Sequence, residues 1–248
     1  MNRPPNNGMQ RTALRAAADA KRWIAGLGDL KMPRVHAVIE GMEFTLFYDY
    51  DQLRDGKLSR LTDSGKVQWF SDRMDMVFVD PLGRIFDTAS VAHRELNSSP
   101  DDIKPRTIMI GAFALLLNGI ESCGSFITDF PPSTNKKNWR RFNAFMTKYM
   151  SVWNAMVVGT SHKNKNMIAI LWEHFRNGIA HGFSVTSGGI EYLGGPRWRV
   201  SSGIMEIDPV LFFKDFLRAK DDLLRDINDK MAREHAHFLK RFRDVYPC

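Results

Sequence analysis

The sequence is poor in cysteine and lacks a long uninterrupted apolar run. Its 248 residues include only Cys123 and Cys248, and this number and spacing exclude a disulfide framework and a zinc site. The most apolar run, residues 108–117, meets Asn118 well short of the ~20 residues needed to cross a bilayer. The first residues contain no apolar core of the signal-peptide type. We therefore expect a cytoplasmic protein that has no membrane-spanning helix and uses no metal or cofactor.

Acidic residues are missing from the whole segment between Asp129 and Glu173. The basic residues of that segment, called the basic strip below, are Lys136, Lys137, Arg140, Arg141, Lys148, Lys163 and Lys165. Such a strip can follow the phosphate backbone of RNA, with each neutralised phosphate adding a salt-dependent contribution to binding. The alternative is a solvated helix face followed by a lysine-rich loop. The formal net charge of +7 adds little to this choice, because most of the excess comes from residues 1–34.

The order of strand-like and helix-like patterns divides the chain into three parts. Residues 1–33 are basic and alanine-rich, and we expect them to form a poorly ordered leader. Residues 34–103 are expected to form a small β-rich or α+β region, because β-branched and aromatic residues recur in short runs between turns. The runs expected as strands are 35–39, 43–48, 67–70, 76–79 and 84–86, with a turn at 81–84. The predicted fold class is therefore α+β, mainly α, with helices from residue 104 onward.

Residues 104–248 are expected to form a helical bundle. The pattern over 106–127 is apolar on most faces, as in a central bundle helix. Aromatic residues then recur at helical spacing over 139–153, which fits a buried stripe, with stacking on nucleic-acid bases as the alternative. A β-hairpin is expected at about 188–207, turning at 194–196. Asp208 and Pro209 then open a long amphipathic helix that reaches about residue 243.

The segment 171–185 places an arginine, an amide and a histidine near the end of an amphipathic helix. Apolar residues at helical spacing form one stripe of this helix, and a glycine follows its last turn. Arg176, Asn177 and His181 lie off that stripe. Arginine stays cationic and histidine titrates near neutrality, so this pair is suited to bind a phosphodiester and to move its protons. The carbonyl end of the helix favours the charged form of His181.

Glu121 lies on the predicted central helix, in a narrow stripe of small and polar residues. An unpaired carboxylate is costly to bury, so we expect Glu121 to meet Arg176, His181 or a lysine, and in that role it would orient the site. The alternative is a carboxylate at a helix end in water. Arg176 has its own alternative, a pairing only with Glu173 three residues back.

The run RNGIAH, residues 176–181, resembles the motif of the higher-eukaryote and prokaryote nucleotide-binding (HEPN) superfamily of helical bundles. That motif is an arginine, usually followed by a polar residue such as asparagine, and then a histidine a few positions on. The helix that carries the run, and the earlier apolar helix with its acidic residue, extend the likeness over roughly residues 104–245. Many members are metal-independent endoribonucleases and often homodimers, in which the arginine and histidine of two subunits meet.

The resemblance implies that the RNA 2′-hydroxyl attacks the adjacent phosphorus at the site. Arg176 would stabilise charge on the phosphate oxygens, His181 would act as general base or acid, and Asn177 would position phosphate or imidazole. Other members of the superfamily have lost catalysis and only bind RNA or nucleotides. Two alternatives therefore stand beside the nuclease: a non-catalytic RNA- or nucleotide-binding module, and a structural helical protein that binds an unidentified protein partner.

Overall fold

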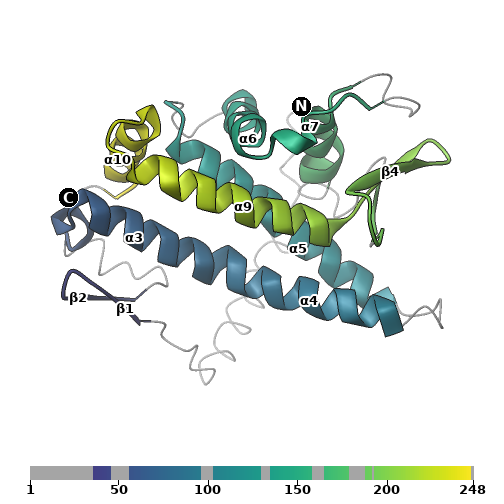
Figure 1. Ribbon diagram of the computed structural model, residues 1–248, viewed down its shortest axis with the longest axis horizontal. Coiled ribbons are helices and arrows are strands. Elements are labelled where there is room, and N and C mark those ends of the chain that lie inside the picture. Colours follow the sequence, from purple (N-terminus) through teal and green to yellow (C-terminus); the bar gives the residue numbers. More distant parts are fainter. Residues whose placement is uncertain are drawn as a thin grey trace, which may run out of the picture. The chain divides into compact units, whose positions relative to one another are not determined.

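The computed structural model describes residues 36–45, 56–95, 103–129, 135–157, 165–178, 188–191 and 193–246. Almost all of them belong to one compact unit, Ala37–Cys248. This unit is mainly helical and contains a small three-stranded mixed sheet (Figure 1). The mainly helical class is confirmed to that extent. The leader predicted for residues 1–33 lies outside the described residues.

Residues 63–95 form one long helix in which a π-helical turn separates two α-helical parts. The three parts are α3 (Asp63–Met74), the π turn η3 (Asp75–Val79) and α4 (Asp80–Glu95). Figure 1 shows α3 and α4 in line with each other. The prediction of strands at 67–70, 76–79 and 84–86, with a turn at 81–84, is therefore wrong.

The three wrongly predicted strands are short parts of one helix, whose buried residues form a single helical stripe. Buried side chains on the long helix include Val67, Phe70, Met74, Leu82 and Phe86. Their spacing is helical on each side of η3. Pro81 is the second residue after η3, and in a regular α-helix its ring would clash with the carbonyl group four residues back. The wider π turn accommodates the ring, so the helix continues where the sequence suggested a turn.

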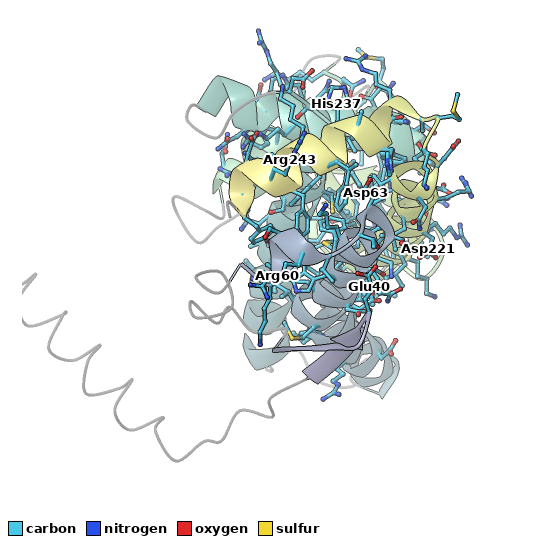
Figure 2. All side chains as sticks on the ribbon, turned by 90° about the vertical axis from the view of Figure 1, so that its left-hand side faces the viewer. Glu40, Arg60, Asp63, Asp221, His237 and Arg243 are labelled. Carbon is cyan, nitrogen blue, oxygen red and sulfur yellow. The ribbon has the colours of Figure 1, made fainter. Side chains whose placement is uncertain are left out.

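A β-hairpin precedes the long helix. β1 (His36–Ile39) and β2 (Met42–Thr45) pair as a two-stranded sheet, so the described residues before α3 hold a hairpin and no larger β-rich region. Glu40 and Gly41 make the turn, with φ angles of 52° and 75°. The Glu40 carboxylate accepts hydrogen bonds from the Thr62 hydroxyl and, at 3.0 Å, from the Thr62 backbone N–H (Figure 2). Because Thr62 caps the start of α3, these bonds fix the hairpin to the helix.

The central helix α5 (Ile103–Phe126) confirms the helix predicted at 106–127. It packs against α4, α6 (Asn135–Tyr149), α9 (Pro209–Asn228) and α10 (Arg233–Val245). Its segment Met109–Phe126 has the length and the mean hydropathy, 1.3, of a membrane span, and 56% of that segment is buried inside the described part of the protein.

The aromatic ladder predicted for 139–153 forms part of the same core. Phe142, Met146 and Trp153 are fully buried, and Trp139 and Tyr149 are packed against them as partly buried side chains. Trp153 belongs to a 3₁₀ turn, η4 (Ser151–Trp153), that follows α6. The three fully buried side chains have no surface on which a base could stack.

α9 runs back along the long helix in the opposite direction. Near the start of α9, Phe213 contacts Phe86 of α4, with ring centroids 5.1 Å apart. Further along, Lys220 Nζ lies 2.6 Å from Oδ1 of Asp75, the first residue of η3. The π turn is thus tied to the core by an ion pair whose lysine is buried.

α9 begins as predicted but ends earlier. Asp208 caps it, accepting hydrogen bonds from the backbone N–H groups of Val210 and Leu211 at 3.0 and 2.9 Å. The helix predicted to reach about residue 243 is instead interrupted at Asp229, whose backbone is extended, and α10 is a separate helix. The interruption allows α10 to fold back onto α5.

The small sheet lies between the motif helix and α9 in the sequence. Its strands are β3 (Gly188–Ile190), β4 (Trp198–Ser201) and β5 (Ile204–Ile207). β5 is the middle strand, antiparallel to β4 and parallel to β3. The predicted hairpin with a turn at 194–196 is therefore wrong, because β3 and β4 do not pair with each other and both pair with β5. The hairpin of this sheet is formed by β4 and β5, and its tight turn is at Ser202 and Gly203, with φ angles of 51° and 76°. The glycines at 194–195 lie in the connection from β3 to β4.

Candidate functional site

The helix that carries the arginine motif consists of α7 (Met167–Ile170) and a second π turn, η5 (Leu171–Arg176). Asn166 caps its start by accepting a hydrogen bond of 2.8 Å from the N–H of Ile168. The predicted apolar stripe is buried at Ile168, Leu171, Trp172 and Phe175. In η5 the N–H of Asn177 bonds to the carbonyl oxygen of Trp172, five residues back. This wider turn sets the direction of Arg176, and π turns often occur at functional sites.

The motif helix is held between α5 and the small sheet. The ring of Phe175 lies 6.0 Å from that of Phe113 on α5, in an edge-to-face arrangement. On the other side, a β-carbon added at Gly188 of β3 would lie 2.5 Å from the Phe175 ring. Only glycine allows the strand to approach this closely, so the helix has little freedom to shift.

Arg176 is bound by three groups of the protein. Its Nη2 donates a hydrogen bond of 2.8 Å to Oε2 of Glu121 on α5, and its Nη1 donates one of 3.1 Å to Oδ1 of Asn177. The guanidinium carbon lies 4.7 Å from the centre of the Trp172 ring, close enough for a cation–π contact. The side chains of Arg176 and Glu121 are 17% and 15% exposed, so the pair is half-buried and reaches the surface.

Glu121 therefore meets one of its three expected partners. The alternative in which Arg176 pairs only with Glu173 is wrong, because Glu173 binds Lys165 at 2.5 Å and Arg176 binds Glu121. His174 also lies near Glu173, with 3.8 Å between its Nε2 and the carboxylate oxygen. His181, the predicted general acid or base, lies outside the described residues, as does the glycine that follows it.

The basic strip divides into residues with different surroundings. Arg140 is exposed on α6, whereas Arg141 is only 5% exposed. Lys148 bridges Asp226 of α9 and Glu234 of α10, at 2.8 and 2.6 Å. Burial lowers the pKa of Lys148, but hydrogen bonds to the two carboxylates raise it by more. The pKa of Lys148 therefore lies above its ordinary value. The side chains of Lys136 and Lys137, and the whole of Lys163, lie outside the described part.

Arg241 on α10, which is not among the site residues predicted from the sequence, lies near this site. Burial lowers the pKa of the buried Arg141, and the charge of Arg241 on α10 lowers it further, while the charge of Glu121 raises it. Arg241 is three residues after Phe238, whose ring packs on Phe126 of α5 with centroids 5.7 Å apart. In the sequence, the signal for the position of Arg241 is its helical spacing of three residues from Phe238, which is buried.

The described residues contain no group of three or more histidine, cysteine, aspartate or glutamate side chains that could hold a metal ion. The side chains that do converge are guanidinium groups, a carboxylate and an amide, which bind through hydrogen bonds and charge. No protein-family model matches the chain, and the comparisons with curated proteins and with solved structures likewise give no match.

Proposed function

We propose that this chain is a metal-independent endoribonuclease of the HEPN type that cleaves RNA with Arg176 and His181. The observation that supports the proposal is the fixed guanidinium of Arg176, which is bonded to Glu121 and Asn177 and stacked against Trp172. A guanidinium held in this way is oriented before the substrate arrives. It can therefore stabilise charge on a phosphate without reorganising during the reaction.

The proposed reaction is an internal transfer within the RNA. The 2′-oxygen forms a bond to the adjacent phosphorus, the bond from phosphorus to the 5′-oxygen of the next nucleotide breaks, and a 2′,3′-cyclic phosphate and a 5′-hydroxyl result. His181 takes the proton of the 2′-hydroxyl or supplies one to the leaving oxygen. Arg176 binds the non-bridging oxygens, and Asn177 positions the phosphate or the imidazole. Glu121 acts as a positioning residue for Arg176.

The proposal includes a homodimer. In a regular helix, positions 176 and 181 do not lie above one another, so one helix does not bring both side chains to the same phosphate. In a homodimer, Arg176 of one protomer and His181 of the partner subunit would face a single phosphodiester. The expected experimental sign is a dimer in solution at the concentrations at which the enzyme is active.

The test is cleavage of labelled RNA by the purified full chain, with and without a chelator. We expect cleavage that persists in the chelator and fragments that end in a cyclic phosphate. His181→Ala and Arg176→Ala should each lower the rate by about 10² to 10⁴, the usual contribution of positioned proton transfer or of one preorganised donor. Arg218→Ala is the control, because its side chain is 77% exposed on α9. Equal cleavage by the parent and His181→Ala would remove the proposal.

A second candidate is binding of RNA or nucleotide without cleavage. The observation that favours it is the held guanidinium of Arg176, bonded to Glu121 and Asn177, because binding a phosphate needs this group and no group that transfers a proton. It predicts RNA binding that weakens steeply with salt while the RNA stays intact. Binding of a protein that ignores salt concentration would instead support the third reading, a structural helical protein with an unidentified protein partner.

A further inference from the structure

Arginines from three different helical segments are connected to Glu121, either directly or through Arg141. Arg176 at the end of η5 donates a hydrogen bond of 2.8 Å to Glu121. The charges of Glu121 and of Arg241 on α10 both act on the guanidinium of Arg141 on α6. We call Arg141, Arg176, Arg241 and Glu121 the arginine cluster. The cluster thus links guanidinium groups from three helical segments to one carboxylate, directly or through Arg141.

Backbone packing holds the members of the cluster in place. A β-carbon added at Gly124, one turn after Glu121, would lie 2.1 Å from the carbonyl oxygen of Arg141, so α5 and α6 are in direct backbone contact there. On α10, the contact of Phe238 with Phe126 places the next turn, which carries Arg241, against the last turns of α5. The cluster is therefore built on rigid elements.

Two donors in the arginine cluster are unsatisfied. The Nε atoms of Arg176 and Arg241 are buried, and neither has a hydrogen-bond acceptor among the described residues. A buried N–H group without an acceptor is costly, and it is more costly on a charged side chain. These two N–H groups thus lack acceptor oxygens among the described residues, and a tetrahedral oxyanion supplies such oxygens.

We propose that the arginine cluster is an oxyanion site that binds a phosphate group, with Arg141 and Arg241 acting beside Arg176. The inference rests on the proposed function in one respect, since Arg176 belongs to both. It names two binding residues that the motif does not contain, and in RNA cleavage the group held would be a phosphodiester. Guanidinium groups suit this ligand because their planar pairs of N–H donors match the spacing of phosphate oxygens.

Glu121 has a defined part in this site. Without a ligand it neutralises one of the three guanidinium charges, and with a ligand it competes for Arg176 and repels the anion. A phosphate must therefore bind against the Glu121 carboxylate. Removing the carboxylate charge should strengthen phosphate binding, whereas removing a guanidinium should weaken it. The two kinds of substitution should therefore change the affinity for phosphate in opposite directions.

The first experiment measures binding of inorganic phosphate to the full chain. Melting temperature is followed at rising phosphate concentration against sodium chloride of equal ionic strength, and the dissociation constant is measured by calorimetry. We expect phosphate to raise the melting temperature of the parent. Arg241→Gln should bind phosphate about tenfold more weakly, the order expected for losing one charged donor. Arg243→Gln, on the exposed side of the same helix (Figure 2), should bind as the parent does.

Two further measurements separate binding from a merely structural role. Glu121→Gln should bind phosphate several-fold more tightly, by the removal of repulsion and competition. Without phosphate, Arg241→Gln should melt no lower than the parent, because a like charge has been removed from the cluster. If Arg241→Gln does not fold, the Glu121→Gln and Arg176→Gln proteins carry the test, with tighter and weaker binding expected.

The proposal is overturned if phosphate has no effect beyond that of chloride, if all variants respond equally, or if Glu121→Gln binds more weakly. Its failure is distinguishable from that of the nuclease. Phosphate binding that follows the cluster, with RNA left intact, supports the oxyanion site and removes the enzyme. Cleavage lost in His181→Ala, together with parent-like phosphate binding by Arg241→Gln, supports the nuclease and removes the oxyanion site. A short RNA used in place of inorganic phosphate shows whether a diester is held by the same residues.

Discussion

Gly124 on α5 lies so close to Arg141 on α6 that a β-carbon at position 124 would be 2.1 Å from the Arg141 carbonyl oxygen. Because the atom in the way is backbone, it cannot turn aside. Gly124→Ala should lower the free energy of unfolding by about 3 kcal/mol, at the upper end of usual overpacking costs. Gly111→Ala is the matched control on the same helix. It meets no atom within 4 Å and should raise the free energy of unfolding by about 0.5 to 1 kcal/mol. Urea denaturation of both variants decides, and equal stabilities would contradict the close approach.

The Glu121–Arg176 pair should show measurable coupling in a double-mutant cycle. Glu121→Gln leaves the guanidinium of Arg176 without its carboxylate, and we expect a loss of about 1 to 2 kcal/mol in unfolding free energy, reduced from the fully buried case by partial exposure. Arg176→Gln in the Glu121→Gln background should cost less than it does alone. Additive effects of the two substitutions would show that the pair does not contribute to stability.

Asp215 connects α9 to the sheet and to η4. Its carboxylate accepts hydrogen bonds from Trp153 Nε1 at 3.0 Å and from two nitrogens of Arg197 at 2.6 and 3.1 Å. Asp215→Asn should therefore lower the unfolding free energy by about 2 kcal/mol, as a buried charged acceptor is replaced. Asp222→Asn on the same helix removes an exposed pair with Arg225 and should change it by less than about 0.5 kcal/mol. Thermal or urea denaturation of both variants measures the difference, and a parent-like Asp215→Asn would disprove the tie.

The hairpin contact should make stability depend on pH in the acid range. Hydrogen bonds from the Thr62 hydroxyl and backbone lower the pKa of Glu40 below its ordinary value of 4.5. Its contribution to stability is therefore present above pH 4.5 and disappears as the pH falls through the lowered pKa. Glu40→Gln should melt below the parent at pH 7, and the gap should close in strong acid. Melting curves over this range test the prediction, and a gap that does not change with pH would reject it.

The sequence predicted those helices whose apolar residues keep a regular period. The helix at 106–127 is one example, and the capped start of the helix after Asp208 is another, since a cap is a local signal. The sequence does not indicate the end of that helix, because the pattern of apolar residues continues past Asp229. The break is decided by how α10 packs on α5, a contact between residues far apart in sequence.

The long helix at 63–95 was missed for a different reason. Val67, Phe70 and Met74 of α3 are three or four positions apart, as are Leu82 and Phe86 of α4, but the step from Met74 to Leu82 is eight positions. A regular helix would turn Leu82 away from Met74 by about 80°. The π turn absorbs one residue and restores a step of seven. A regular spacing of apolar residues in the sequence does not indicate this helix, because the position of the wider turn is not known from the sequence.

The candidate site was predictable in part. A carboxylate on an apolar helix needs a partner, and Arg176 was among the partners expected for Glu121. Arg241 could not be found in this way, because its relation to Arg141 depends on the fold-back of α10. The sequence predicts one continuous surface for the basic strip, whereas burial of Arg141 and the ion pairs of Lys148 separate its members.

The π turn at 75–79 also determines where this protein can be shortened. Because that turn holds one residue more than an α-helical turn, deletion of Val77 together with Pro81→Ala would convert it into a regular turn and keep Leu82 and Phe86 facing the interior. The replacement of Pro81 is needed because its ring would clash with the carbonyl group four residues back in a regular turn. Deletion of Gln68, in the regular part, would instead rotate every later residue of the helix by about 100° and expose both side chains. Versions of this chain that lack one residue of the long helix and still fold are therefore expected to have lost it between positions 75 and 79.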